Sequence, residues 1–134
     1  MIMNKRFIAI DPGREKTGIA IFFDGKVIKH EIINSDDLIE VIQKVIAEYA
    51  ITLIVIGNGT SSKAKCKILK KSFPQMIVVV VNEYRTTDEA RKLYFKMNPP
   101  KGLKRLIPLG MQVPPVPVDD YAAIVIGKKY LQEK

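Results

Sequence analysis

Two short, wholly apolar runs place the tightest constraint on the fold. Residues 53–56 read Leu-Ile-Val-Ile, and residues 77–81 read Ile followed by four valines. Strands without polar alternation are expected where helices cover both faces of a parallel sheet. Helical periodicity before each run predicts those helices, over about 36–49 and 61–72. The sequence therefore predicts an α/β fold.

The N-terminal third predicts an antiparallel meander. Residues 5–11, 17–24 and 26–33 have the composition of strands, and Asp24-Gly25 between the last two is a strong hairpin signal. After the meander, Ser35 is a candidate N-cap for the first helix. The apolar positions of that helix follow a helical period and are Leu38, Ile39, Ile42, Val45 and Ile46.

The second half predicts strand 77–82 and helices over about 87–96 and 119–132. Thr86-Thr87-Asp88-Glu89 has capping-box spacing, so Glu89 is interpreted as a cap. Residues 97–117 hold six of the eight prolines and predict a long irregular loop. The resulting order is β-β-β-α-β-α-β-α, which predicts a mixed five-stranded sheet with three antiparallel strands followed by parallel ones and helices on both faces.

Length and composition predict one globular domain over residues 1–134. The chain is 47% hydrophobic and 27% charged, as is usual for globular proteins. No apolar run approaches the roughly 20 residues of a membrane helix, and no charged-then-apolar leader is present, so we expect no membrane association. The single cysteine, Cys66, excludes an internal disulfide and favours a cytoplasmic location.

The net charge of +8 is concentrated in two stretches that contain no acid. Residues 61–81 carry Lys63, Lys65, Lys67, Lys70 and Lys71, and residues 90–118 carry Arg91, Lys92, Lys96, Lys101, Lys104 and Arg105. In the helix predicted at 61–72, Lys63, Lys67, Lys70 and Lys71 share one face, with Ala64 and Ile68 on the other. Such segregation favours a nucleic-acid partner, the alternative being a solvated lysine-rich surface.

Acidic side chains recur at the ends of predicted elements. Asp11 ends the first strand, Glu83 follows the strand at 77–82, and Asp119 and Asp120 open the last helix. Because strands one and four should end at one rim of the sheet beside helix starts, we expect these acids to meet. Carboxylates suit Mg²⁺ or Mn²⁺, and two such ions about 3.5–4 Å apart promote phosphodiester cleavage.

The residues themselves leave alternatives open at each acid. A strand-end carboxylate is a weak signal alone, and an aspartate at a helix start is also explained by capping. We expect one of Asp119 and Asp120 to cap the helix while the other binds metal. His30 has no histidine or cysteine companion and is interpreted as a surface strand residue.

Taken together, the motifs resemble the RNase H-like superfamily, and within it the RuvC-like and YqgF-type nucleases. Asp11-x-Gly13-x-x-x-x-Gly18-x-Ala20 is similar to the first motif of the family, whose aspartate binds metal. Residues 82–90 resemble the YqgF pattern Asp-Glu-Arg-x-Thr-Thr-x-Glu-Ala. Asp119-Asp120-Tyr121-Ala122-Ala123 resembles the closing Asp-x-x-Ala-Ala, which aligns Asp119 better than Asp120.

The resemblance implies a nuclease for Holliday-junction DNA or a ribosomal RNA precursor. The implied metal ligands are Asp11, Glu83 and Asp119, with Asp120 as a further catalytic candidate. The predicted nucleic-acid contacts are Lys63, Lys67, Lys70, Lys71, Arg85, Lys101, Lys104 and Arg105. Asn82 and Tyr84 depart from the pattern, which has Asp and Arg there. By analogy, a two-fold junction would favour a homodimer.

Three functions are compatible with these features. The preferred one is a Mg²⁺-dependent endonuclease that acts on structured nucleic acid by a two-metal mechanism. The second is a nucleic-acid-binding module of the same fold that cleaves poorly or not at all, given Asn82 and Tyr84. The third is half of a sugar-kinase-like or actin-like ATPase, which would need a second domain that 134 residues cannot supply.

Overall fold

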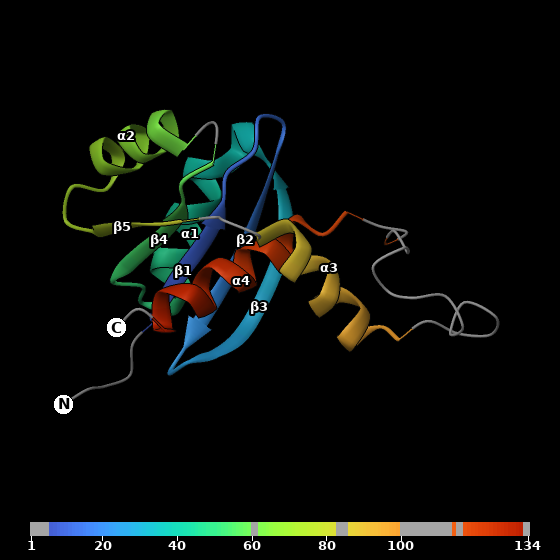
Figure 1. The fold of residues 1–134 in the computed structure, drawn as a ribbon. Coiled ribbons are helices and arrows are strands. Elements are labelled where there is room, and N and C mark those ends of the chain that lie inside the picture. Colours follow the sequence, from blue (N-terminus) through green and yellow to red (C-terminus); the bar gives the residue numbers. More distant parts are fainter. Residues whose placement is uncertain (1–5, 60–61, 83–85, 100–113, 115–116, 133–134) are drawn as a thin grey trace.

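Five strands form one sheet, with helices on both of its faces (Figure 1). The computed structural model describes residues 6–59, 62–82, 86–99, 114 and 117–132. The elements in chain order are β1 (Arg6–Asp11), β2 (Lys16–Phe23), β3 (Lys26–Asn34), the 3₁₀ helix η1 (Ser35–Asp37), α1 (Leu38–Tyr49), β4 (Leu53–Gly57), α2 (Ser62–Ser72), β5 (Ile77–Val81), α3 (Thr86–Met97) and α4 (Asp119–Gln132).

The sheet order is β3-β2-β1-β4-β5. The first three strands pair antiparallel, and β1, β4 and β5 pair parallel, which confirms the predicted topology. Ile10 pairs with Ile56, and Ile56 pairs with Val80, so these three strands end at one edge, which we call the carboxyl rim. Two helices, α3 and α4, follow β5, as predicted at 87–96 and 119–132, although the element order β-β-β-α-β-α-β-α counted only one of them.

Each face of the sheet is covered because side chains alternate along the strands. On one face, Ile8 and Ile10 of β1 pack in a cluster with α1 and with Leu69 of α2. On the other face, Phe7 and Ala9 pack in a cluster with α4. Helix α3 packs against α4 rather than lying on the sheet. The helices therefore divide between both faces, as predicted.

Local sequence accounts for the turns and helix ends of the meander. Asp24 and Gly25 have φ values of 54° and 84°, so the predicted hairpin turn with positive φ at both residues is confirmed. The predicted N-cap at Ser35 is wrong. Asp37 occupies the cap position of α1 without a side-chain cap bond, while Ser35 is buried inside η1. Its hydroxyl is used in a contact with the β1–β2 turn, described below.

In α2, the residues assigned to the face opposite the lysines are not the buried ones. Ala64 and Ile68 are exposed, with Ile68 at 45%, whereas Ser62 and Leu69 are buried. Residues seven apart lie on one helical face, so the Ser62–Leu69 face packs inward and Ile68 is rotated away from it. Strand β5 is the edge strand beside this helix, and its Val80 is 50% exposed.

Most of the proline-rich stretch at 97–117 lies outside the described residues. Within the part of the chain that the structure describes, every helix is too short or too polar to cross a membrane.

Candidate active site

Asp11 and Gly18 lie side by side at the carboxyl rim. They are direct partners in the β1–β2 ladder, one step beyond the Ile10–Ile19 pair and two beyond the Ala9–Ala20 pair. Ala9 and Ala20 belong to the cluster on the α4 side of the sheet. Because side chains alternate with a period of two, Asp11 shares that face with Ala9. The strand end therefore presents Asp11 on the side where α4 begins.

Gly18 brings the start of α4 to the same place. A β-carbon built on Gly18 would lie 1.9 Å from the carbonyl oxygen of Asp119 and 2.8 Å from the backbone nitrogen of Asp120. Only a residue without a side chain permits this approach. Since Gly18 pairs with Asp11, the packing places the backbone of Asp119 beside the partner of Asp11. The start of α4 therefore lies at the strand end that carries Asp11, whereas the expected meeting of the two acidic side chains stays a prediction.

Asp120 is engaged by protein groups at both carboxylate oxygens. Its Oδ2 lies 2.7 Å from Nδ1 of His30, and its Oδ1 accepts the backbone N–H of Tyr121 at 3.0 Å. An ionised carboxylate only accepts hydrogen bonds, so the ring N–H of His30 donates. The His30 ring also packs against the Tyr121 ring, with 5.2 Å between centroids. These contacts favour Asp119 over Asp120 as the acid left to a metal ion.

His30 lies in a strand, as interpreted, but the interpretation missed its contact with Asp120. Its side chain is 30% exposed, that of Asp120 is 14% exposed, and the two form a partly buried pair. His30 pairs with Ala20 in the β2–β3 ladder and so lies on the α4 side of the sheet. The two residues are 90 positions apart in sequence. Nothing in the sequence alone relates them, because the contact depends on where α4 crosses the sheet.

The surroundings of Asp119 disfavour the ionised form of its carboxyl group. Burial raises the pKa of the Asp119 carboxyl, and the neighbouring charge of Asp120 raises it further. Both causes act against the ionised form. A divalent cation beside Asp119 would offset both, since it supplies positive charge where solvation is reduced. Hard carboxylate oxygens are also the ligands that Mg²⁺ and Mn²⁺ prefer, so Asp11 and Asp119 fit such an ion chemically.

A buried hydroxyl pair supports the turn that follows Asp11. Ser35 Oγ donates to the carbonyl oxygen of Gly13 at 2.8 Å and lies 2.8 Å from Oγ1 of Thr17. The Ser35 backbone N–H donates to the carbonyl of Glu15, also at 2.8 Å. Thr17 and Ser35 are both buried. The bonds join η1 to the β1–β2 turn and so hold the position of the Asp11 strand end.

Glu83, the third predicted ligand, lies outside the described residues. Within the described ranges, no three histidine, cysteine, aspartate or glutamate side chains are grouped so that they could hold a metal ion. Val81 pairs with Gly57 at the carboxyl rim, so β5 ends on the same edge as β1. The complete ligand set of Asp11, Glu83 and Asp119 stays a prediction.

The predicted nucleic-acid contacts divide into two groups. Lys63, Lys67 and Lys70 line one open cavity of about 780 Å³ on α2, together with Asn58 and Val80. They therefore share a face, as expected, and Lys71 is exposed on the same helix. The remaining candidates, Arg85, Lys101, Lys104 and Arg105, lie outside the described residues.

Several proteins similar to this chain are named as nucleases or resolvases. No family model matches the sequence. Proteins from two strains of Bacteroides fragilis are each named "Putative pre-16S rRNA nuclease". Each is 28% identical to this chain over an alignment of 142 positions, and the alignment covers 96% of this chain and 97% of the relative.

Two solved structures share the fold over nearly their whole length. Thermus thermophilus RuvC has a TM-score of 0.58 at 10% identity, with 94% of this chain and 92% of RuvC covered. Fowlpox virus resolvase, solved in complex with its substrate Holliday-junction DNA, has a TM-score of 0.61 at 13% identity, with 96% and 97% covered. The RNase H-like fold and the resemblance to RuvC-like and YqgF-type proteins are confirmed.

Proposed function

We propose that this chain is a divalent-metal-dependent endonuclease that hydrolyses phosphodiester bonds in structured nucleic acid. The observation that carries the proposal is the contact between Gly18 and the backbone of Asp119, which brings the start of α4 to the strand end at Asp11. The raised pKa of Asp119 supports a cation there, because burial and a second carboxylate leave negative charge without full solvation.

Each residue has a defined part in this proposal. Asp11, Glu83 and Asp119 would hold Mg²⁺ or Mn²⁺. A divalent cation held there would supply positive charge for activation of the attacking water and for stabilisation of the leaving oxygen. His30 holds Asp120 through its ring nitrogen and so orients the first turn of α4. Ser35 supports the turn after Asp11 through the carbonyl of Gly13.

The substrate is a ribosomal RNA precursor or Holliday-junction DNA. The 28% identity to proteins named for pre-16S rRNA favours the RNA, since it extends over 96% of this chain. The junction is suggested by the fold shared with the two resolvases. Residues 1–134 act as one domain in either case, and a two-fold junction would call for a homodimer.

Cleavage assays with matched substitutions test the proposal. Labelled precursor RNA and four-way junction DNA are incubated with Mg²⁺ or Mn²⁺, and binding is measured separately with Ca²⁺. Asp11→Asn and Asp119→Asn are expected to abolish cleavage while binding is retained. Asp36→Asn, which changes an exposed aspartate of η1, is the control and should cleave normally.

A second function is favoured by one position in the sequence. Asn82 stands where the YqgF pattern has an aspartate, so a neutral amide replaces a carboxylate there while the lysine-rich stretches that favour nucleic-acid binding are kept. Tight binding without metal-dependent cleavage of either substrate would support this second function, a binding module of the same fold, and would contradict the nuclease proposal.

A further inference from the structure

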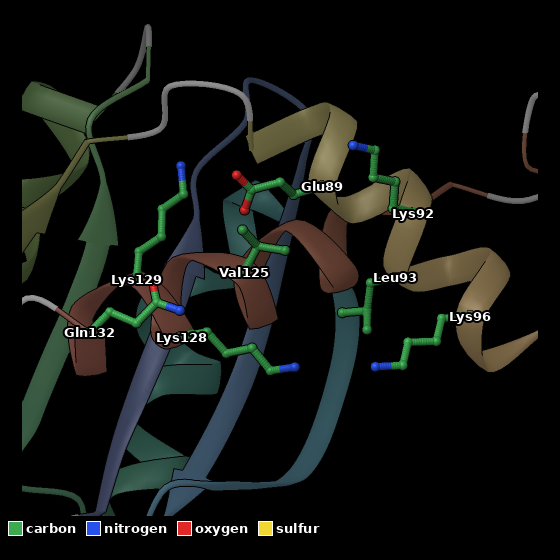
Figure 2. Close-up of a pocket in the computed structure, with 8 residues that line it drawn as sticks. All are labelled: Glu89, Lys92, Leu93, Lys96, Val125, Lys128, Lys129 and Gln132. Atoms are coloured by element: carbon green, nitrogen blue, oxygen red, sulfur yellow. The ribbon is translucent and has the colours of Figure 1, made fainter. Parts of the chain in front are cut away.

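A lysine-lined groove runs between α3 and α4, away from the acidic start of α4. It has a volume of about 290 Å³, and four lysines line it: Lys92 and Lys96 from α3, and Lys128 and Lys129 from α4. Figure 2 shows that the Lys96 and Lys128 side chains extend toward each other across the space between the helices. A single carboxylate, Glu89, lines the same groove.

The groove has a rigid apolar floor. Leu93 and Val125 line it, and both belong to a cluster in which α3 packs on α4 through Ala90 and Ala122. Small residues at this contact let the helices approach closely, so the lysines on either side are held on a fixed base. The positions of the charges are therefore set by helix packing and not by a loop.

Three of the four groove lysines form no ion pair with another described residue. The ion pairs formed among described residues are Lys29–Glu31, His30–Asp120 and Lys44–Glu40. Lys92, Lys96 and Lys128 take part in none of them. Lys96 and Lys128 extend toward each other (Figure 2), so their like charges repel, and an anion placed between them would relieve that repulsion.

The groove continues toward the candidate active site. A neighbouring hollow of about 380 Å³ shares Leu93 and Lys128 with it and extends over Lys29 and His30 of β3. His30 in turn contacts Asp120 at the start of α4. With about 1.5 Å of rise per residue, Lys128 lies roughly 14 Å along α4 from Asp119. A polyanion bound at the acids could reach the lysines without leaving the surface of α4.

We propose that the α3–α4 groove binds backbone phosphates of the nucleic-acid substrate, on an arm outside the cleaved position. This inference rests on the proposed function, because the nucleic acid that would fill the groove is the substrate proposed there. Phosphates spaced a few ångströms apart along a strand match converging ammonium groups, and such contacts position the substrate without reading its sequence. Lys92, Lys96, Lys128 and Lys129 are then positioning residues for binding and take no part in the chemistry.

The test compares two double variants in which the same amount of charge is removed. Lys96→Gln/Lys128→Gln changes the groove, and Lys26→Gln/Lys44→Gln changes two exposed lysines elsewhere. Binding of labelled junction DNA and precursor RNA is followed by fluorescence anisotropy with Ca²⁺, from 50 to 200 mM salt. Each lysine–phosphate interaction that is removed should reduce the log–log salt slope by about 0.7–0.9, so the double groove variant should lose about 1.4–1.8, equivalent to roughly 25–60-fold weaker binding at 0.1 M salt.

The outcomes separate this inference from the proposed function. A salt slope that is smaller than the wild-type slope only in the groove variant would support phosphate binding in the groove. Equal salt slopes for the two variants would overturn the inference, whether or not those slopes differ from the wild-type slope. Wild-type protein that binds but never cleaves would contradict the nuclease proposal and leave the slope comparison intact. Thermal midpoints of both variants should match the wild type, since all four side chains are exposed.

Discussion

Replacing Gly18 with alanine should separate the start of α4 from the strand end at Asp11. The new β-carbon would lie 1.9 Å from the carbonyl oxygen of Asp119, 2.2 Å from its carbonyl carbon and 2.8 Å from the nitrogen of Asp120. All three are backbone atoms, so no side-chain rotation relieves the clash. Ordinary contact begins at 3.4 Å, and the helix start must therefore move by about 1.5 Å.

The displacement should reduce both the unfolding free energy and the cleavage rate. Overpacking of this kind typically costs about 1–3 kcal/mol of unfolding free energy. The effect on catalysis should be larger, because a misplacement of about 1 Å can reduce the rate roughly 100-fold. Asp119 moves relative to Asp11, so the two proposed metal ligands are no longer placed as in the native fold.

Gly127→Ala is the matched control for the Gly18 variant. Its β-carbon would lie 2.2 Å from the ring of Phe22, farther along α4 and away from the acids. Urea denaturation should show a loss of stability for both variants, while cleavage by the folded protein should fall sharply only for Gly18→Ala. Wild-type cleavage and stability in Gly18→Ala would refute the inferred packing at the active site.

Three further substitutions test the surroundings of the site. Asp119→Asn should raise the thermal midpoint of metal-free protein at neutral pH. Because the pKa of Asp119 is raised in the native state, the wild-type protein loses stability as pH rises above the ordinary value of 3.8. The difference in midpoint between the variant and the wild type should therefore vanish below pH 3.8 and grow above it. Ser35→Ala should lower the unfolding free energy by about 1–3 kcal/mol in urea denaturation, because Gly13 and Thr17 are left without a buried partner, whereas exposed Ser72→Ala should not. His30→Ala should also lower the unfolding free energy in urea denaturation, because the mostly buried carboxylate of Asp120 loses its ring partner. An unchanged urea midpoint would contradict the inferred role of His30 in holding Asp120.

Much of the fold could be predicted because it depends on local patterns. Short apolar runs such as residues 53–56 and 77–81 predict buried strands. The Asp24-Gly25 pair predicts a turn with positive φ, as observed. The period of Leu38, Ile42 and Val45 likewise predicts the buried face of α1. The errors arose where the pattern was ambiguous. In α2, Ile68 and Leu69 are adjacent and both apolar, so the sequence did not distinguish which of them points inward.

The sequence by itself determined which acids, glycines and lysines are present and which elements carry them, because hydrophobic period and turn chemistry act over a few residues. Only the tertiary structure decided that Gly18 meets the backbone of Asp119, that His30 holds Asp120, and that Lys96 converges with Lys128. These contacts join residues far apart in the chain. They follow from how closely α4 packs on the sheet and α3 on α4, which no local pattern specifies.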